Sequence, residues 1–179
     1  NMTPKDRQLA LFRIADALEA RAEEMADVES QNTGKPGPTL VDYEVLVSVD
    51  QIRFFAGAAR NLEGRATAEY STSHTSSIRR EPIGVIGVII PWNGPLVAIS
   101  MTVVLALAAG NAVVLKPPTQ TPFVAIRFGE LALEAGIPEG VLNVVPGDAA
   151  AGEALVAHPA IGKVSFTGGD SVARSVMHT

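Results

Sequence analysis

The chain has 179 residues, of which 47% are hydrophobic and 18% are charged, with a net charge of −5 at pH 7. This composition is too apolar for a disordered chain, and the length suffices for one large domain or two small ones. The acidic balance and the lack of a lysine and arginine cluster argue against a nucleic-acid-binding surface. The sequence has no cysteine, which excludes a disulfide scaffold, a thiolate metal site and thiol catalysis within these residues.

No secretory signal opens the chain, because the first eight residues are polar and charges recur through the segment that follows. Residues 82–115 carry no formal charge, but a Pro-Trp-Asn-Gly-Pro turn and a later Gly-Asn pair interrupt them. We therefore expect buried globular structure there and not a membrane span. Together these features predict a cytoplasmic protein that binds neither membrane nor nucleic acid.

Two helices are predicted near the N-terminus. Thr3 can act as an N-cap before a proline at the first helical position, and apolar residues then recur at helical spacing over residues 4–30. A segment rich in glycine and proline ends this helix, and a second helix is predicted over residues 39–59. The residues expected on one side of the second helix are Leu40, Tyr43, Leu46 or Val47, Val49 or Asp50, and Phe54.

Residues 66–80 are polar and rich in threonine and serine, and residues 75–80 indicate an exposed strand. Exposed strand edges pair readily with another chain unless they are covered. This stretch is therefore a candidate oligomer contact, and a plain surface strand is about as good an interpretation.

Beyond residue 82 short apolar strands alternate with helices. The strands are predicted at residues 85–90, 112–115, 141–145 and 163–166, and the helices at 95–109, 121–135, 149–157 and from about 169 onward. This alternation is typical of right-handed βαβ units and predicts an α/β fold with a Rossmann-like parallel sheet and flanking helices. The chain stops inside the last predicted helix, which we interpret as a truncation.

Ligands of such sheets bind beyond the carboxyl ends of the strands, where helix N-termini offer free N–H groups. Four loops qualify, and they follow the four strands at residues 91–94, 116–119, 146–148 and 167–170. Lys116 at a strand end is a candidate phosphate or ribose ligand, and Thr-Gly-Gly before a helix is a candidate anion cradle. A G-x-G-x-x-G fingerprint and a P-loop are both missing from the sequence.

Four motifs in order resemble the aldehyde dehydrogenase superfamily over essentially the whole chain. They are GVIGVIIPWNGP (84–95), ALAAGNAVVLKP (106–117), EAGIPEGVLNVVPG (134–147) and SFTG (165–168). Two earlier stretches, FFAGAAR (54–60) and TSSIRR (75–80), look most like the aminoaldehyde and betaine-aldehyde branch. The resemblance implies the N-terminal portion of this fold, with NAD or NADP as cofactor.

The resemblance also implies roles for the Pro-Trp-Asn motif. Asn93 corresponds to the family's oxyanion donor, whose amide stabilises the charge on the thiohemiacetal oxygen. Ile90, Pro91 and Trp92 correspond to cofactor contacts. From spacing alone, the Asn-Gly pair would be an ordinary turn and Trp92 a half-buried core aromatic.

Lys116 resembles the family's adenosine-ribose lysine, and the competing interpretation is a solvated strand-end lysine. Three positions later the family usually has a glutamate that binds both ribose hydroxyls, whereas this chain has Thr119. A carboxylate there would repel a 2′-phosphate, so its absence removes one barrier to NADP. We therefore expect NAD or NADP without choosing between them.

The turn formed by Phe166, Thr167, Gly168 and Gly169 matches the strand-to-helix turn that faces the pyrophosphate in the family. Here Gly169 replaces a usual serine, and Asp170 adds a negative charge that suits a helix N-terminus but not a pyrophosphate.

Gly147 matches the glycine after Val-Val-Pro in the family. The usual second glycine is Ala149 here, and the loop is about one residue short. These changes and those in the preceding turn put tight cofactor binding, but not the fold, in question.

The family's nucleophilic cysteine and its general-base glutamate lie downstream of the matched segments, so this chain alone is expected to be inactive. The implied function is NAD(P)-dependent oxidation of an aldehyde, possibly an aminoaldehyde, to a carboxylic acid by a homodimer or homotetramer. The alternative is a non-catalytic nucleotide-binding or assembly module. We expect N-terminal helices over residues 1–65, part of the oligomerisation strands over 66–82, and a cofactor domain over 83–179. No metal site is expected, because the three histidines are scattered.

Overall fold

The computed structural model describes residues 2–179, and only the backbone of Arg65, Ala66 and Tyr70. The first part is helical, with α1 (Pro4–Ala20), α2 (Ala22–Thr33), α3 (Gly37–Leu40), the π-helical turn η1 (Val41–Val45) and α4 (Leu46–Ala58). A hairpin of β1 (Arg65–Ser71) and β2 (His74–Ile78) follows. The remainder alternates β3 (Val85–Ile89), α5 (Pro95–Ala108), β4 (Ala112–Lys116), α6 (Phe123–Glu134), β5 (Leu142–Val144), α7 (Ala149–Ala157), β6 (Lys163–Phe166) and α8 (Asp170–His178).

The central sheet has four parallel strands in the order β5-β4-β3-β6. This arrangement confirms the α/β prediction, since continuous apolar strands form parallel sheets that are covered on both faces. The chain starts in the middle of the sheet at β3, proceeds outward through β4 to β5, and then returns to place β6 on the other side of β3. The strand order therefore reverses between β3 and β6, which is where ligands bind in open α/β sheets.

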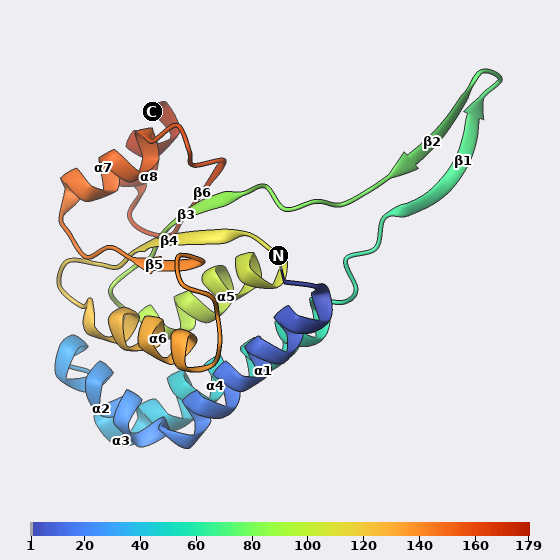
Figure 1. Ribbon diagram of the computed structural model, residues 1–179. Coiled ribbons are helices and arrows are strands. Elements are labelled where there is room, and N and C mark those ends of the chain that lie inside the picture. Colours follow the sequence, from blue (N-terminus) through green and yellow to red (C-terminus); the bar gives the residue numbers. More distant parts are fainter. Residues whose placement is uncertain (1) are drawn as a thin grey trace.

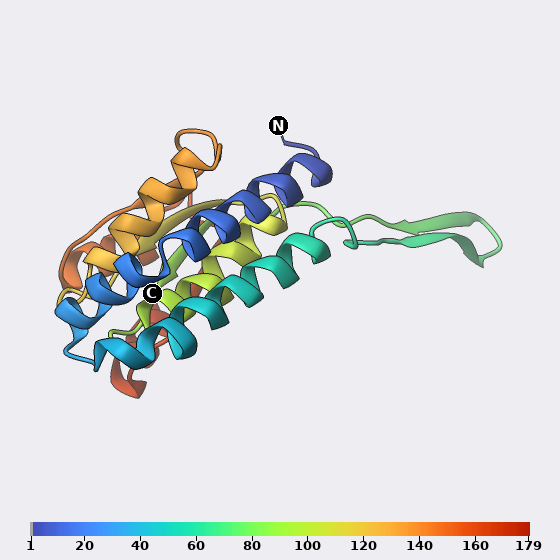
Figure 2. The same cartoon turned by 90° about the horizontal axis from the view of Figure 1, so that it is seen from below.

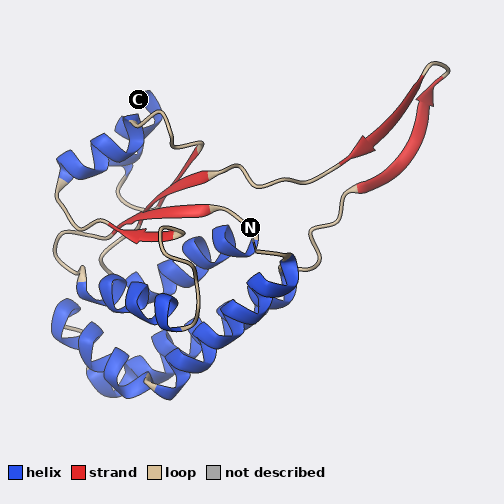
Figure 3. Ribbon diagram, viewed as in Figure 1, coloured by secondary structure: helices blue, strands red, loops and turns tan. Residues whose placement is uncertain are grey.

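Helices cover the two faces of the sheet unequally (Figures 1 and 3). Helices α5 and α6 pack on one face, with α1 and α4 forming a further layer behind them (Figure 2). We call this the closed face. Helices α7 and α8 lie on the other side, which we call the open face. This split follows from right-handed crossovers, because the two outward connections place their helices on one face and the return connection places α7 on the other.

Two arginines of α1 fasten this outer layer to the helices beneath it. Arg7 Nε donates to the Ala108 carbonyl at 3.0 Å, and Arg13 Nε donates to the Ala135 carbonyl at 2.6 Å. Both carbonyls lie at helix C-termini, on α5 and α6 respectively, where unpaired carbonyls and the helix dipole favour a cation.

The first helix begins as predicted and ends earlier. The Thr3 side chain accepts from the Asp6 N–H, and the Asp6 carboxylate accepts from the Thr3 N–H at 3.1 Å, which completes a capping box. The predicted single helix over residues 4–30 is two helices, because the chain leaves helical geometry at Arg21 (φ −118°, ψ 29°). This break lets α2 turn to pack against α6.

The predicted apolar side of the second helix is partly wrong. Tyr43 is 74% exposed and Phe54 is 69% exposed, whereas Val45 and Ile52 are fully buried. The π-helical turn η1 explains the error, because its wider turn shifts the phase of the side chains relative to a regular α-helix.

The hairpin of β1 and β2 projects away from the rest of the molecule (Figure 1). Its strands pair antiparallel, with bulges between Arg65 and Ala68 and between Glu69 and Ser71. The exposed strand predicted at residues 75–80 is thus present, although it ends at Ile78. Within the described part of the chain, no helix has the length and apolar character needed to cross a bilayer.

Candidate functional site

The loops after β3 and β6 meet at the reversal of strand order and line a cavity of about 430 Å³. We call it the switch-point cavity. Its walls hold eight of the residues predicted to form the site: Ile90, Pro91, Trp92, Asn93, Phe166, Thr167, Gly168 and Gly169. Residues almost eighty positions apart are thus brought together by the pairing of Ile89 with Phe166 in the sheet.

A second cavity of about 300 Å³ lies between α7 and α8 on the open face. This α7–α8 cavity shares Ile89 and Val172 with the switch-point cavity, so the two adjoin. Lys116 lines it from the end of β4 and is only 8% exposed. Burial lowers the pKa of Lys116, and the negative charge of Asp148 partly opposes this shift.

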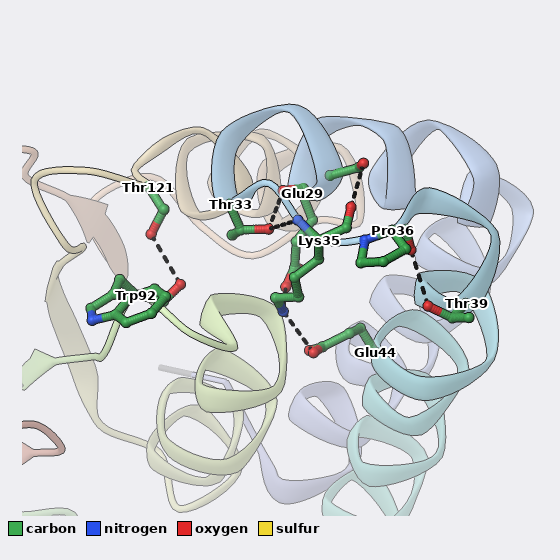
Figure 4. A network of polar contacts seen from close by, with 9 residues as sticks. Glu29, Thr33, Lys35, Pro36, Thr39, Glu44, Trp92 and Thr121 are labelled. Atoms are coloured by element: carbon green, nitrogen blue, oxygen red, sulfur yellow. Dashed lines mark hydrogen bonds and ion pairs between the residues drawn. The ribbon is translucent and has the colours of Figure 1, made fainter.

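The turn after β3 presents Asn93 to solvent. Ile90 is buried, while Trp92 is 59% exposed. The buried Thr121 hydroxyl donates a long hydrogen bond of 3.5 Å to the Trp92 carbonyl, which tethers the turn to the start of α6 (Figure 4). Within residues 2–179 no hydrogen bond engages the Asn93 side chain, so its amide is free to donate to a ligand.

The turn after β6 is shaped by close contacts. The Thr167 N–H donates to the Ile89 carbonyl at 3.0 Å, which extends the pairing of β6 with β3. A Cβ on Gly168 would lie 2.7 Å from the tip of the Phe166 ring, so a larger residue there would have to displace that ring. Gly169 is the N-cap of α8, and a Cβ there would meet nothing within 4 Å. The turn therefore leaves an open space in front of a helix N-terminus.

Thr119 and Gly147 line neither of these two cavities. Instead, the Thr119 hydroxyl donates to the Gly147 carbonyl at 3.0 Å and ties together the loops after β4 and β5. A Cβ on Gly147 would lie 2.6 Å from the Ala151 Cβ, so the tight entry into α7 requires glycine. The structure therefore explains Gly147 by its close packing against α7 and not by a position in either cavity.

A partly buried ion cluster of Glu29, Lys35 and Glu44 lies in the same region as Trp92 and Thr121 (Figure 4). Lys35 Nζ donates to Glu29 Oε1 at 2.6 Å and to Glu44 Oε1 at 2.7 Å. Burial raises the pKa of Glu29, and the hydrogen bond from Lys35 offsets part of that rise. Glu44 also faces the turn that carries Asn93, because a Cβ on Gly94 would lie 3.6 Å from Glu44 Oε2.

Sequence reasoning missed this ion cluster and also the cavity-lining residues Ser171 and Val172, whereas Asp148 lies in one of the four predicted loops. The available signal for Ser171 and Val172 was their position in the first turn of α8. For the ion cluster, the only signal in the sequence was that Glu29 occupies a position on the apolar side of a predicted helix.

A larger cavity of about 610 Å³ lies at the opposite, amino end of the sheet. Arg7, Asn111, Pro138 and Val141 are among its lining residues. We favour the carboxyl edge as the site, because free N–H groups of helix N-termini gather there and not at the amino end. Among the residues that the structure describes, no group of three or more histidine or acidic side chains could hold a metal ion.

Comparison with known proteins now identifies the family. A sequence model described as "Aldehyde dehydrogenase family" matches residues 1–179. The chain belongs to the aldehyde dehydrogenase family. It is 43% identical over 172 residues to the mitochondrial aldehyde dehydrogenase of Leishmania tarentolae, covering 96% of this chain and 34% of that protein. It is 44% identical over 182 residues to the phenylacetaldehyde dehydrogenase of Pseudomonas fluorescens, covering 98% of this chain and 36% of that protein.

Solved structures agree with this assignment of family and fold. The NAD+ complex of an aldehyde dehydrogenase from Bacillus cereus is 39% identical, with a TM-score of 0.95, and the match covers 99% of this chain and 36% of that one. The chain thus spans about a third of the length of these relatives. The likeness to the aminoaldehyde branch is not tested by these names and stays a prediction.

Proposed function

We propose that this chain supplies the cofactor site and the oxyanion donor of an NAD(P)-dependent aldehyde dehydrogenase that oxidises an aldehyde to a carboxylic acid. The observation that carries the proposal is the gathering of eight predicted site residues, seven of them in the family motifs, around one cavity at the reversal of strand order. Family membership and the NAD+ complex of the Bacillus cereus relative support it.

The residues fit a dinucleotide. The open space beyond Gly169, at the N-terminus of α8, suits a pyrophosphate, because unpaired N–H groups and the helix dipole favour an anion there. Asp170 would oppose this anion, but its carboxylate is paired with Arg174 Nε at 3.1 Å. Two adjoining cavities suit the two halves of an extended ligand, with Lys116 in one and Trp92 in the other.

When bound, NAD(P) supplies the acceptor for the hydride that leaves the aldehyde carbon. Asn93 would then donate its amide N–H to the substrate oxygen that becomes negatively charged when a nucleophile attacks. A preorganised donor of this kind is worth about 10²–10³ in rate. Glu44 of the ion cluster lies next to Gly94, the residue that follows Asn93.

A non-catalytic nucleotide-binding module is the rival function. These 179 residues contain no cysteine, so the nucleophile of the proposed enzyme would have to come from outside them. The two functions share the cofactor site and differ only in turnover. Aldehyde-dependent reduction of NAD+ by the complete protein, lowered about 10²–10³-fold by Asn93→Ala, would support the enzyme over the module.

The shared cofactor site is tested by thermal unfolding with and without NAD+. A ligand that binds only the folded state raises the melting temperature by mass action. Gly169→Val is the matching variant, because a Cβ there meets nothing within 4 Å and the larger side chain would enter the space proposed for the pyrophosphate. We expect NAD+ to raise the melting temperature of the wild type and not that of the variant, each compared with the same protein without NAD+. No stabilisation of the wild type at millimolar NAD+ would reject the site.

We further propose that the projecting hairpin of β1 and β2 contributes to a homodimer or homotetramer, with residues 1–65 and 83–179 forming the helical layer and the cofactor domain. The exposed edges of the hairpin strands support this, because unpaired backbone groups invite pairing with a second chain. Analytical ultracentrifugation of the complete protein, with and without residues 67–76, tests it. A monomer in both cases would reject it.

A further inference from the structure

The turn after β3 contains a chemically reactive pair of residues, Asn93 and Gly94. The chain has six asparagines, and Asn93 is the only one that precedes a glycine. The side chain of an asparagine can react with the backbone nitrogen of the next residue. Glycine favours this reaction most, because it has no side chain to hinder the attack and adopts the widest range of backbone conformations. The pair is therefore the place in the sequence where a side-chain amide is most readily lost.

Both reacting groups of this pair are free in the structure. Asn93 is exposed, and no hydrogen bond within residues 2–179 holds its side chain. Among the described residues, no acceptor engages the Gly94 N–H either. The pair lies in the irregular turn between β3 and α5, so the two groups are outside the hydrogen bonds of both elements. The Gly94 nitrogen can thus approach the side-chain carbonyl carbon of Asn93.

The other asparagines that the structure describes are held by hydrogen bonds. Asn32 and Asn111 are engaged at both side-chain atoms, in each case by backbone groups. Asn61 and Asn143 donate their amides to backbone carbonyls at 3.4 and 2.8 Å. Each of the four is followed by a residue that carries a side chain. They are internal controls for the reactivity of Asn93, because they share its chemistry and lack its freedom.

We propose that Asn93 is a site of spontaneous deamidation, a modification that removes the oxyanion donor. The Gly94 nitrogen attacks the side-chain carbonyl carbon of Asn93, and a new C–N bond closes a succinimide ring. The C–N bond of the side-chain amide breaks, and the proton from the Gly94 nitrogen leaves with it as part of ammonia. Water then adds to one of the two ring carbonyls and opens the ring to aspartate or isoaspartate. Water is the only co-reactant, and nothing is oxidised or reduced.

The modification converts a hydrogen-bond donor into an acceptor. An ionised carboxylate at position 93 has no N–H to offer and carries a negative charge. It would face the substrate oxygen that becomes negative during the reaction, so the transition state loses its stabilisation. The turn after β6 is unchanged, so NAD+ binding persists. This loss of turnover rests on the proposed function, whereas the modification itself does not.

The test follows deamidation of the complete protein over time, at each asparagine, by peptide mapping with mass spectrometry. We expect Asn93 to convert at least about tenfold faster than the four hydrogen-bonded asparagines. Gly94→Ala is the matched variant, because a Cβ there makes an ordinary contact of 3.6 Å with Glu44 Oε2 and the φ of −162° is extended backbone that alanine adopts. It should slow conversion of Asn93 at least about tenfold and leave the other four rates unchanged. Aldehyde-dependent turnover should decline in step with conversion in the wild type and decline correspondingly more slowly in the variant.

Asn93→Asp reproduces one product directly and gives a second measurement if Gly94→Ala is unstable. Its turnover should be about 10²–10³-fold below that of fresh wild type, while NAD+ still raises its melting temperature. Conversion of Asn93 no faster than that of the four controls would overturn the inference and leave the proposed function standing. Rapid conversion without loss of turnover would uphold the modification and reject the oxyanion role of Asn93.

Discussion

The two faces of the sheet differ in how far their helices are buried. On the closed face, α5 buries nine residues and α6 buries five, including Phe128 at 0% exposure. On the open face, α7 buries only Leu155, and no residue of α8, all of which the structure describes, is buried. Burial of apolar surface is the main favourable term in folding, so the closed face carries most of the stability. The α7–α8 cavity and its candidate binding residues lie on the open face.

The residue types of the helices already indicate this difference in burial between the two faces. Helix α5 carries no charged residue over Pro95–Ala108 and buries nine residues, although Met101 and Leu105 are about half exposed. Helix α8 alternates valines with Asp170 and Arg174, and Val172 and Met177 stay 53% and 85% exposed. Exposed apolar side chains gathered on one helix mark a surface that contacts something else. On α8 that surface includes part of the cavity wall.

The largest effect is expected from truncating the closed-face core. Phe128→Ala should lower the free energy of unfolding by about 3–5 kcal/mol, because it loses buried apolar area and leaves a cavity. Val172→Ala on the open face should change it by less than about 0.5 kcal/mol. Chemical denaturation of both variants measures the contrast. Equal losses at the two positions would mean that the faces do not differ in stability as described.

Removing Lys35, the partly buried cation of the ion cluster, should lower the free energy of unfolding by nearly as much. Lys35→Met leaves the carboxylate of Glu29, which is fully buried, without its partner, and breaking such a pair costs about 3 kcal/mol. The exposed Lys5→Met is the matched control, with an expected change below about 0.5 kcal/mol. If both variants unfold at the same denaturant concentration, the cluster does not stabilise the closed face.

The same cluster predicts a pH dependence. Burial alone would lower the pKa of Lys35, but hydrogen bonds to Glu29 and Glu44 outweigh it and raise the pKa above its ordinary 10.5. The folded state therefore binds the proton more tightly than the unfolded chain. Its stabilisation is complete below pH 10.5 and is lost as the pH rises through the raised value. The stability gap between wild type and Lys35→Met should narrow over that range, and a constant gap would contradict the assignment.

A smaller loss of stability is expected from a substitution at Gly147, in the tight turn that enters α7. Gly147→Ala places a Cβ 2.6 Å from that of Ala151, so the turn or α7 must shift, at a cost of about 1–2 kcal/mol. Gly57→Ala in α4 is the control, since a Cβ there meets nothing within 4 Å and should stabilise the helix by about 0.5–1 kcal/mol. A lowered melting temperature for Gly147→Ala and a raised one for Gly57→Ala would agree with the structure. A raised melting temperature for Gly147→Ala would contradict it.

The smallest effect concerns the start of α1. Thr3→Ala removes the capping box and should cost about 1 kcal/mol. The hydrogen bonds from the Thr3 side chain and backbone lower the pKa of Asp6, so the part of the stabilisation that involves the Asp6 carboxylate is present above pH 3.8 and is lost as the pH falls through the lowered value. The bond from the Asp6 N–H to the Thr3 hydroxyl does not titrate, so the stability difference between variant and wild type should narrow in acid but not vanish. A difference that does not change with pH would contradict a bond between the Thr3 hydroxyl and the Asp6 carboxylate.

Much of the fold followed from local signals. Glycine and proline stops and unbroken β-branched runs predicted each strand of the parallel sheet to within about two residues, because these signals act over a few neighbouring positions. The break at Arg21 and the π-helical turn were not predictable in this way. Both depend on how one helix packs on another, and a phase shift inside a helix leaves no local signal.

The candidate site likewise has features that the sequence predicted and features that it did not. The four strand-end loops were predicted to meet because carboxyl ends of parallel strands share an edge, and the strand order confirms it. The proximity of Asp148 to Lys116, 32 positions apart, depends on β4 lying beside β5 and on the path of the loop into α7. Likewise, no spacing rule could show that the Thr119 hydroxyl donates a hydrogen bond to the Gly147 carbonyl. Roles of individual loop residues thus needed the three-dimensional structure.

The most direct test of the cofactor site uses Trp92, the only tryptophan of the chain, which is 59% exposed in the wall of the switch-point cavity. NADH absorbs where tryptophan emits, so a dihydronicotinamide bound nearby should quench Trp92 by energy transfer. We expect saturable quenching on titration of the full chain with NADH, and a much weaker response in Gly169→Val. Trp92 emission that stays unchanged, or quenching equal in the variant, would contradict dinucleotide binding at this edge of the sheet.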